Sequence, residues 1–250
     1  MESSVFPLSF LDDRPIHVGG LGSLGKPLAE SMFRKEVPEL HLWDPDVIES
    51  RNRFNQRVYD RDIGTPKVIV CAQHFREIYP ESKTKVIVHH ERITPATELS
   101  GIVFSAVDWM RIRYEEILPC VLRQKDQISF YVDGRVGIDG GKAYGLDPSN
   151  SNHVYHYVND PLHNHPDPVD GELNAACKSD FAMPENADMV AAEMAWRLTM
   201  WLHLEQGSLE PYDNFVGWQF MPRRAVITEQ WDSGTVRALQ ALDDGVPESA

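Results

Sequence analysis

The chain contains 250 residues, of which 42% are hydrophobic, and it carries a formal charge of −14 at neutral pH. This length and apolar content allow one large α/β domain or two small ones. The negative charge is not offset by a local cluster of Lys and Arg, which argues against nucleic-acid and membrane-surface partners. No apolar run is long enough to cross a bilayer, and the N-terminus lacks the features of a signal peptide, so we expect a cytoplasmic protein.

The first predicted strand begins at Ile16 and runs into a glycine-rich turn, which is followed by a predicted helix from Leu24 to about Glu36. The glycines of this turn fit the pattern G-x-G-x-x-G, which is typical of nucleotide-binding folds; they are Gly20, Gly22 and Gly25. A helix N-terminus favours an anionic group placed over such a turn. The alternative is a loop that only needs a positive φ angle.

A second short strand, Leu40–Trp43, is followed by Asp44, about twenty residues beyond the last glycine of the turn. In a βαβ nucleotide-binding fold, this position holds the carboxylate that accepts hydrogen bonds from the ribose hydroxyls. The alternative is a turn-forming role for Asp44 in the sequence Asp44-Pro45-Asp46.

A polar loop, Glu49–Arg57, is rich in arginine and asparagine and leads to a helix that begins near Lys67. Guanidinium and amide donors match phosphate oxygens, so the loop suggests a triphosphate ligand. A solvated loop followed by an ordinary helix start is the alternative.

Together these motifs resemble the ThiF-type family, which includes ubiquitin-activating enzymes and the adenylyltransferases that activate sulfur-carrier proteins. The resemblance extends to a strand that ends in an acid, Val103–Asp108, and to a helix from Trp109 to about Arg123. It implies an α/β, Rossmann-like three-layer fold with a mostly parallel sheet. The motifs that carry it earlier in the chain are Gly20–Gly25, Asp44–Asp46, Asn52 with Gln56, and Ile63–Lys67.

The resemblance also implies a reaction, in which ATP and Mg²⁺ bind and the C-terminal carboxylate of a ubiquitin-like protein, sulfur-carrier protein or peptide attacks the α-phosphate to form an acyl-adenylate. Asp108 would hold magnesium, Asp44 the ribose, and Asn52 and Lys67 the phosphates. One metal-binding carboxylate is sufficient, because magnesium in such sites also uses phosphate oxygens. The remaining expected nucleotide-binding residues are Gly20, Gly22, Gly25, Asp46, Arg53 and Gln56.

The chain departs from the family pattern at Asn55, where the family has an arginine three residues after the asparagine. Either Arg53 or Arg57 supplies that positive charge from a backbone position shifted relative to the family, or the phosphates are bound more weakly. Many members also carry an N-terminal arginine that reaches the active site of the partner subunit, and Arg14 is a candidate to replace it. Because its cysteines form no C-x-x-C pair, we expect no structural zinc held by four cysteines.

Further strands are predicted at Ile128–Asp133 and within Gly134–Gly145, which resembles the strand-turn-strand that faces the substrate tail but also suits an ordinary hairpin. The histidine-rich segment His153–His165 is predicted to be a polar strand and a loop over the active-site mouth. Metal binding by these histidines is the alternative.

Cys177 lies before a predicted helix over residues 186–204, and family members that form a thioester keep their cysteine in a similar loop. The neighbouring Lys178 would favour the thiolate of Cys177. The other interpretation is a buried apolar thiol, as expected for Cys71 and Cys120. The helix is apolar on much of its circumference, which favours a homodimer.

We therefore predict a single adenylation domain over residues 1–228, whose last strand lies within Tyr212–Phe220. An acidic, flexible tail over residues 229–250 would follow, with a short amphipathic helix over Val236, Leu239 and Leu242. Two rival functions remain open. A NAD-dependent oxidoreductase would use the same glycines and Asp44, and a scaffold of the same fold would bind nucleotide or a ubiquitin-like partner without catalysis.

Overall fold

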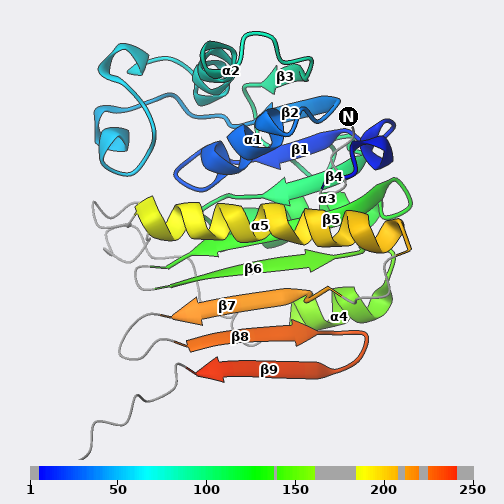
Figure 1. The fold of residues 1–250 in the computed structure, drawn as a ribbon. Helices are drawn as coiled ribbons and strands as arrows, with labels where there is room; N and C mark the ends of the chain where they lie inside the picture. The colour runs from blue at the N-terminus through cyan, green and yellow to red at the C-terminus, as the bar shows by residue number, and fades with distance from the viewer. Residues whose placement is uncertain (1–5, 138–139, 161–183, 208–211, 220–224, 241–250) are drawn as a thin grey trace, which may run out of the picture.

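The computed structural model describes residues 6–137, 140–160, 184–207, 212–219 and 225–240. In these ranges the strands form one nine-stranded sheet in the order β3-β2-β1-β4-β5-β6-β7-β8-β9 (Figure 1). The first five strands pair in parallel, and the remaining strands continue the sheet in antiparallel pairs. The strands are β1 Ile16–Gly19, β2 Glu39–Trp43, β3 Lys85–His89, β4 Gly101–Ser105, β5 Ile128–Val136, β6 Gly140–Leu146, β7 Phe215–Gln219, β8 Ala225–Gln230 and β9 Thr235–Gln240.

Helices cover both faces of this sheet and make a three-layer α/β fold. The cluster on one face contains residues from α1 (Gly25–Arg34), α2 (Lys67–Ile78) and α5 (Pro184–Glu205), and Figure 1 shows α5 lying across this face. The cluster on the other face contains residues from a π-helical segment, η4 (Ile112–Ile117), and from α3 (Leu118–Arg123) and α4 (Ser151–Asn159). The expected Rossmann-like fold is therefore confirmed.

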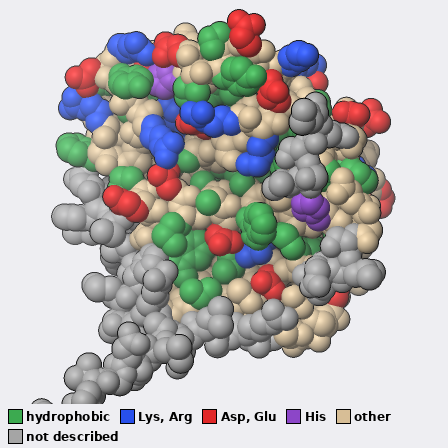
Figure 2. Space-filling model, in the orientation of Figure 1, with side chains coloured by type: hydrophobic (Ala, Val, Ile, Leu, Met, Phe, Trp, Pro, Cys, Tyr) green, Lys and Arg blue, Asp and Glu red, His purple; other side chains and the backbone are tan. Residues whose placement is uncertain are grey.

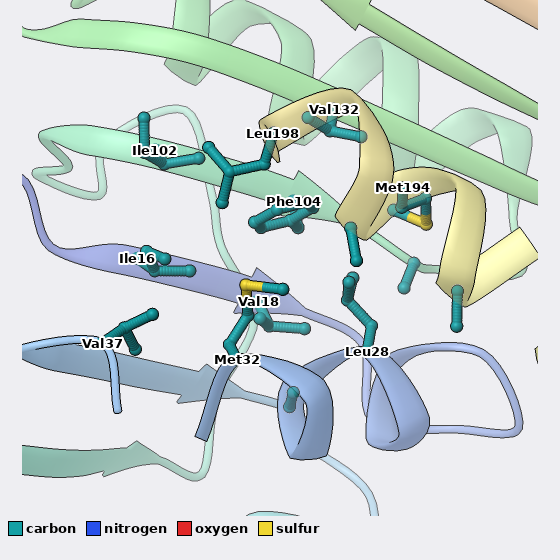
Figure 3. Packing of buried hydrophobic residues seen from close by; sticks show 14 of the residues in the cluster. Ile16, Val18, Leu28, Met32, Val37, Ile102, Phe104, Val132, Met194 and Leu198 are labelled. Atoms are coloured by element: carbon teal, nitrogen blue, oxygen red, sulfur yellow. The ribbon is translucent and has the colours of Figure 1, made fainter. Parts of the chain in front are cut away.

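The core on the α5 face follows from alternation along the strands and from helical spacing (Figure 3). Ile16 and Val18 point to one side of β1, and Leu28 and Met32 lie one turn apart on α1, so these four side chains meet. All four are fully buried, and each contributes roughly 1.5–3 kcal/mol by leaving water. This packing fixes the start of α1 against the end of β1.

Several short elements complete the described chain. Three 3₁₀ segments are η1 (Leu8–Leu11), η2 (Ser50–Phe54) and η3 (Asp60–Asp62). The expected helices at residues 24–36, from Lys67 and over 186–204 are all present. The antiparallel pair of β5 and β6 is compatible with both interpretations of Gly134–Gly145, the substrate-facing unit and the ordinary hairpin. The expected helix over 109–123 contains the π-helical turn of η4.

The prediction of a strand at the start of the histidine-rich segment is wrong, because residues 151–159 form α4. The Asn150 side chain caps this helix by accepting hydrogen bonds from the backbone N–H groups of Asn152 and His153. The apolar face of the helix buries Tyr157 against the rings of Tyr131 and Tyr144. Capping and packing thus override the strand propensity of this stretch.

The amphipathic helix predicted over Val236, Leu239 and Leu242 is also wrong where the structure describes it, since residues 235–240 form β9. This strand pairs with β8, which itself pairs with β7, so the sheet continues through residue 240. Residue 229, the expected start of the tail, lies within β8. The division into a domain over 1–228 and a tail over 229–250 otherwise stays a prediction.

Candidate functional site

A cleft of about 140 Å³ opens at the carboxyl ends of β1, β2 and β4. The chain leaves β3 at one edge of the sheet and crosses to β4 on the other side of β1, so the cleft lies where the strand order reverses. Open α/β sheets bind their ligands at such a switch point. The cleft is lined by Gly19, Gly20, Gly22, Trp43, Asp44, Pro45, Asp46, Lys67, Arg92, Ile93, Ala106, Val107, Asp108, Trp109, Ile112 and Ile117.

The three glycines of the turn meet different requirements. Gly20 has a φ of +87°, and a Cβ at this position would lie 2.7 Å from the Ala106 carbonyl oxygen. A Cβ at Gly25 would lie 1.7 Å from the Gly20 carbonyl oxygen. Gly22, in contrast, lines the cleft, and a Cβ there would meet only the Gln56 amide nitrogen at 3.8 Å. Thus Gly20 and Gly25 let the turn close, while Gly22 leaves its backbone open to a ligand.

Asp44 joins the glycine turn to the end of β2. Its Oδ2 accepts a hydrogen bond of 2.7 Å from the Leu21 N–H, and its Oδ1 accepts one of 2.8 Å from the Asp46 N–H. Burial raises the pKa of Asp44, and Lys67 and the two backbone donors oppose this rise. The carboxylate lines the cleft, and its two hydrogen bonds hold the backbone of the glycine turn and of the turn after β2 in place. Asp44 therefore combines the turn-forming role with a position suited to ligand binding.

Lys67, at the start of α2, is surrounded by carboxylates. Its Nζ donates a hydrogen bond of 2.9 Å to Asp46 Oδ2. Burial acts to lower the pKa of Lys67, but the neighbouring carboxylates outweigh it and raise the pKa above its ordinary value; these are Asp44, Asp46 and Asp108. The ammonium is therefore held fully charged at the wall of the cleft.

Asp108 is exposed at the mouth of the cleft, three residues after β4 ends at Ser105. The backbone before it is held by the buried Arg113 of η4, which donates to the Val107 carbonyl and, at 2.8 Å, to the Gly134 carbonyl. Arg113 is ion-paired with the buried Asp133 of β5. Arg113 lies in the π-helical segment η4, and such segments are frequent at functional sites.

The polar loop after β2 lies beside the cleft, and none of its predicted ligands is among the lining residues. Asn52 Oδ1 accepts a hydrogen bond of 2.8 Å from the Glu49 N–H and so caps η2. Arg53 is ion-paired with Asp60 at 2.7 Å. Gln56 approaches Gly22, and its buried Oε1 has no hydrogen-bond partner among the described residues.

Neither of the other two arginines considered as replacements is among the lining residues. Arg57 donates a hydrogen bond of 2.8 Å to Asp188 of α5. Its backbone carbonyl accepts from the buried Lys26, whose Nζ also lies 2.8 Å from His74 Nδ1. Arg14 lies over the Trp201 ring, with its guanidinium carbon 5.4 Å from the ring centroid.

Arg92 and several apolar residues of the cleft were missed by the motif analysis. Arg92 and Ile93 follow β3, Trp109 follows β4, and Trp43 directly precedes Asp44. Their common signal is position: each lies just before or after the carboxyl end of a parallel strand. The switch-point rule, applied to the predicted strands, would have found them.

Two histidines of the histidine-rich segment, His153 and His156, contact the turn between β8 and β9. His153 Nε2 lies 3.0 Å from Asp232 Oδ2, and the His156 ring stacks on Trp231 with centroids 5.7 Å apart. Over the described ranges, no group of three or more His, Cys, Asp or Glu side chains is arranged to hold a metal ion. His163, His165 and Cys177 lie outside these ranges.

The fold and cleft define a Rossmann-like α/β protein with a ligand site at the switch point of its sheet. The sequence model of the ThiF family matches residues 10–164, which is more than half of the chain. The chain therefore belongs to the ThiF family, whose members include adenylyltransferases of the ubiquitin-activating type.

Individual relatives agree with this assignment. The catalytic subunit of the NEDD8-activating enzyme E1 of Saccharomyces cerevisiae is 28% identical over 144 residues, which are 53% of this chain and 46% of that subunit. The chain thus spans about half the length of this relative. Among solved structures, the tRNA N6-threonylcarbamoyladenosine dehydratase TcdA of E. coli has a TM-score of 0.52 at 19% identity, covering 80% of this chain and 91% of that one.

E. coli MccB, solved with ATP, has a TM-score of 0.58 at 13% identity and covers 93% of this chain and 65% of that one. TcdA has likewise been solved with ATP. At these identities the structural matches show the shared fold. No helix in the described residues combines the length and apolar character needed to cross a membrane.

Proposed function

We propose that the protein is an ATP-dependent adenylyltransferase that activates the C-terminal carboxylate of a ubiquitin-like protein, a sulfur-carrier protein or a peptide. The observation that carries this proposal is the charged group at the switch-point cleft, where Lys67 is held among Asp44, Asp46 and Asp108. Family membership supports the reaction class. Relatives solved with ATP support the cosubstrate, and MccB solved with a MccA peptide supports a peptide tail as the second substrate.

In the proposed reaction, a carboxylate oxygen of the substrate forms a bond to the α-phosphorus of ATP. The bond from that phosphorus to the oxygen bridging to the β-phosphate breaks, so the products are an acyl-adenylate and pyrophosphate. Catalysis of this kind depends mainly on placement and on stabilisation of charge. The backbone at Gly22 and the N-terminus of α1 would bind phosphate oxygens, Lys67 would neutralise charge, and Asp44 would hold the ribose.

The residues at the cleft fit a magnesium ion that arrives with the nucleotide. Mg²⁺ in phosphate-transfer sites uses one or two carboxylates together with substrate phosphates, and it keeps several waters. Asp108 is exposed in the cleft and would provide one carboxylate, while Asp46 is already paired with Lys67. When bound, the ion would neutralise negative charge that develops on the phosphates.

The loop residues Asn52, Arg53 and Gln56 remain proposed nucleotide contacts. Gln56 has the strongest support, because it lies beside Gly22 and its buried amide oxygen lacks a partner among the described residues. Cys177 remains a proposed acceptor or sulfur-handling residue. Its test is whether Cys177→Ser still completes transfer after adenylation.

The homodimer is also a proposal, supported by the exposed side of α5. Met189 is 40% exposed and Trp196 50% exposed on this helix, and Figure 2 shows hydrophobic side chains on the face that α5 covers. Large exposed apolar groups on one helix are typical of an interface. Analytical ultracentrifugation of wild type and Trp196→Glu should show a dimer that is weakened by the substitution.

A second candidate function is a nucleotide- or partner-binding scaffold of the same fold. The specific observation in its favour is that Asn55 replaces the family arginine, while Arg53 and Arg57 are tied to other carboxylates. Exchange of labelled pyrophosphate into ATP, measured with Mg²⁺ and candidate C-terminal tails, separates the two. Tail-dependent exchange supports the adenylyltransferase, whereas ATP binding without exchange for any tail supports the scaffold.

A further inference from the structure

The cleft has a charged part and an apolar part. The charged part contains the glycine turn, the Lys67–Asp46 pair and Asp108. The apolar part contains Trp43, Ile93 and Ile117, which belong to the hydrophobic cluster on the sheet face covered by α3 and α4. A nucleotide has the same division, since its phosphates are anionic and its base presents two flat, weakly polar faces.

Arg92 lines the cleft and directly precedes Ile93, one of the residues of its apolar part. Its neighbour Ile93 is buried, with its Cδ1 atom 3.1 Å from the position that a Cβ would take on Gly19. The same Gly19 position is 3.8 Å from Ile117 Cδ1, so these residues lie together at the end of β1. Arg92 follows the carboxyl end of β3 and is itself exposed.

The guanidinium of Arg92 differs from the other charged groups of the cleft. Lys67 is committed to the carboxylates around it, with Asp46 at 2.9 Å. Within the part of the chain that the structure describes, Arg92 forms neither an ion pair nor a hydrogen bond, although it lines the cleft. Since a guanidinium is planar, weakly hydrated and stacks readily on aromatic faces, this position suits contact with a base.

We propose that Arg92 contacts the base of the nucleotide, with its guanidinium lying flat against the nucleobase at the apolar end of the cleft. This inference rests on the proposed nucleotide site. Ile93 and Ile117 provide the apolar surface beside Arg92. This role is different from replacing the family arginine at Asn55, which would be a contact with phosphate.

Calorimetric titrations with ATP and AMP test the proposal on wild type, Arg92→Ala and Arg92→Lys. Arg92→Ala should weaken both nucleotides by a similar factor of about ten, because both carry the same base. Arg92→Lys keeps the charge but lacks the planar face, so it should also lose most of this affinity. Arg34→Ala removes an exposed arginine on α1 outside the cleft and is the matched control, which should bind as wild type.

Since Arg92 is exposed, its variants should unfold at the wild-type temperature, and a reduced affinity then reports the site itself. Unchanged affinity in Arg92→Ala would overturn the inference, as would full rescue by Arg92→Lys. A loss that is much larger for ATP than for AMP would also overturn it, because that result assigns Arg92 to the phosphates. If wild type binds neither nucleotide, the proposed nucleotide site fails, and the inference fails with it.

Discussion

Replacing Asp133 should destabilise the protein strongly, because this carboxylate is the shared partner of two guanidiniums. Its side chain is fully buried and pairs with Arg113, which is 4% exposed, and with Arg135 at 3.1 Å. The Tyr157 hydroxyl also donates a hydrogen bond of 3.1 Å to it. Asp133→Ala would leave these donors buried without their acceptor.

Removing one partner of a buried ion pair costs about 3–5 kcal/mol. For a chain of this size, 1 kcal/mol shifts the melting temperature by roughly 2–4 °C, so Asp133→Ala should lower it by about 6–20 °C. The control is Asp60→Ala, which breaks the Arg53–Asp60 pair at 2.7 Å, whose side chains are 46% and 75% exposed. Exposed pairs of this kind contribute at most about 1 kcal/mol.

Calorimetric melting of both variants measures the contrast between a buried and an exposed pair. A double-mutant cycle with Arg113→Met should give a coupling of about 0.5–3 kcal/mol, since the two side chains are in contact. Equal shifts for Asp133→Ala and Asp60→Ala would refute the reasoning, because burial would then not set the cost. Asp133→Ala should also weaken magnesium-dependent nucleotide binding, as Arg113 fixes the backbone carbonyl that precedes Asp108.

Three further predictions concern the cleft and the sheet. Asp108→Ala should abolish magnesium dependence of ATP binding while leaving the melting temperature unchanged, and full tail-dependent pyrophosphate exchange in this variant would disprove the assignment. Gly25→Ala places a Cβ 1.7 Å from a backbone oxygen and should cost about 3 kcal/mol or more in urea unfolding, whereas Gly22→Ala should fold normally but bind ATP more weakly. Burial, with two neighbouring histidines, lowers the pKa of His17 to about 3, and its Nδ1 accepts a hydrogen bond from Trp43 Nε1. Because the unfolded chain takes up this proton near pH 6.5, stability should fall as pH drops from 6.5 toward 3, by about 2 kcal/mol at pH 5, and His17→Gln should remove this part of the slope.

The sequence was sufficient to predict the β1-turn-α1 unit, because local and tertiary requirements agree there. The glycines that fit the nucleotide motif are also the residues that allow the turn to close against Ala106, and the apolar spacing of α1 matches the face it buries. The same agreement holds for α2 and α5. Such consistency between local pattern and global packing makes a segment predictable from one sequence.

The strand expected at Val154–Tyr157 failed for the opposite reason. Its β-branched and aromatic residues favour a strand, but the Asn150 cap and the burial of Tyr157 against Tyr131 select a helix. β9 was not predicted, because a strand at this position depends on pairing with β8, which was not predicted either. In both segments, the secondary structure depends on contacts with residues outside the segment.

The arginines of the polar loop show a second limit of sequence reasoning. Their number and spacing suggest a phosphate-binding loop, yet the partner of each guanidinium depends on what folds beside it. Arg57 pairs with Asp188, which is 131 positions away in the chain, and that contact turns it from the cleft toward α5. An exposed arginine that is already paired with a carboxylate of the fold, as Arg53 and Arg57 are, must break that pair before it can contact a ligand. By this criterion, the described structure favours Arg92 over the arginines that the motif indicated, although Arg92 belongs to none of the motifs.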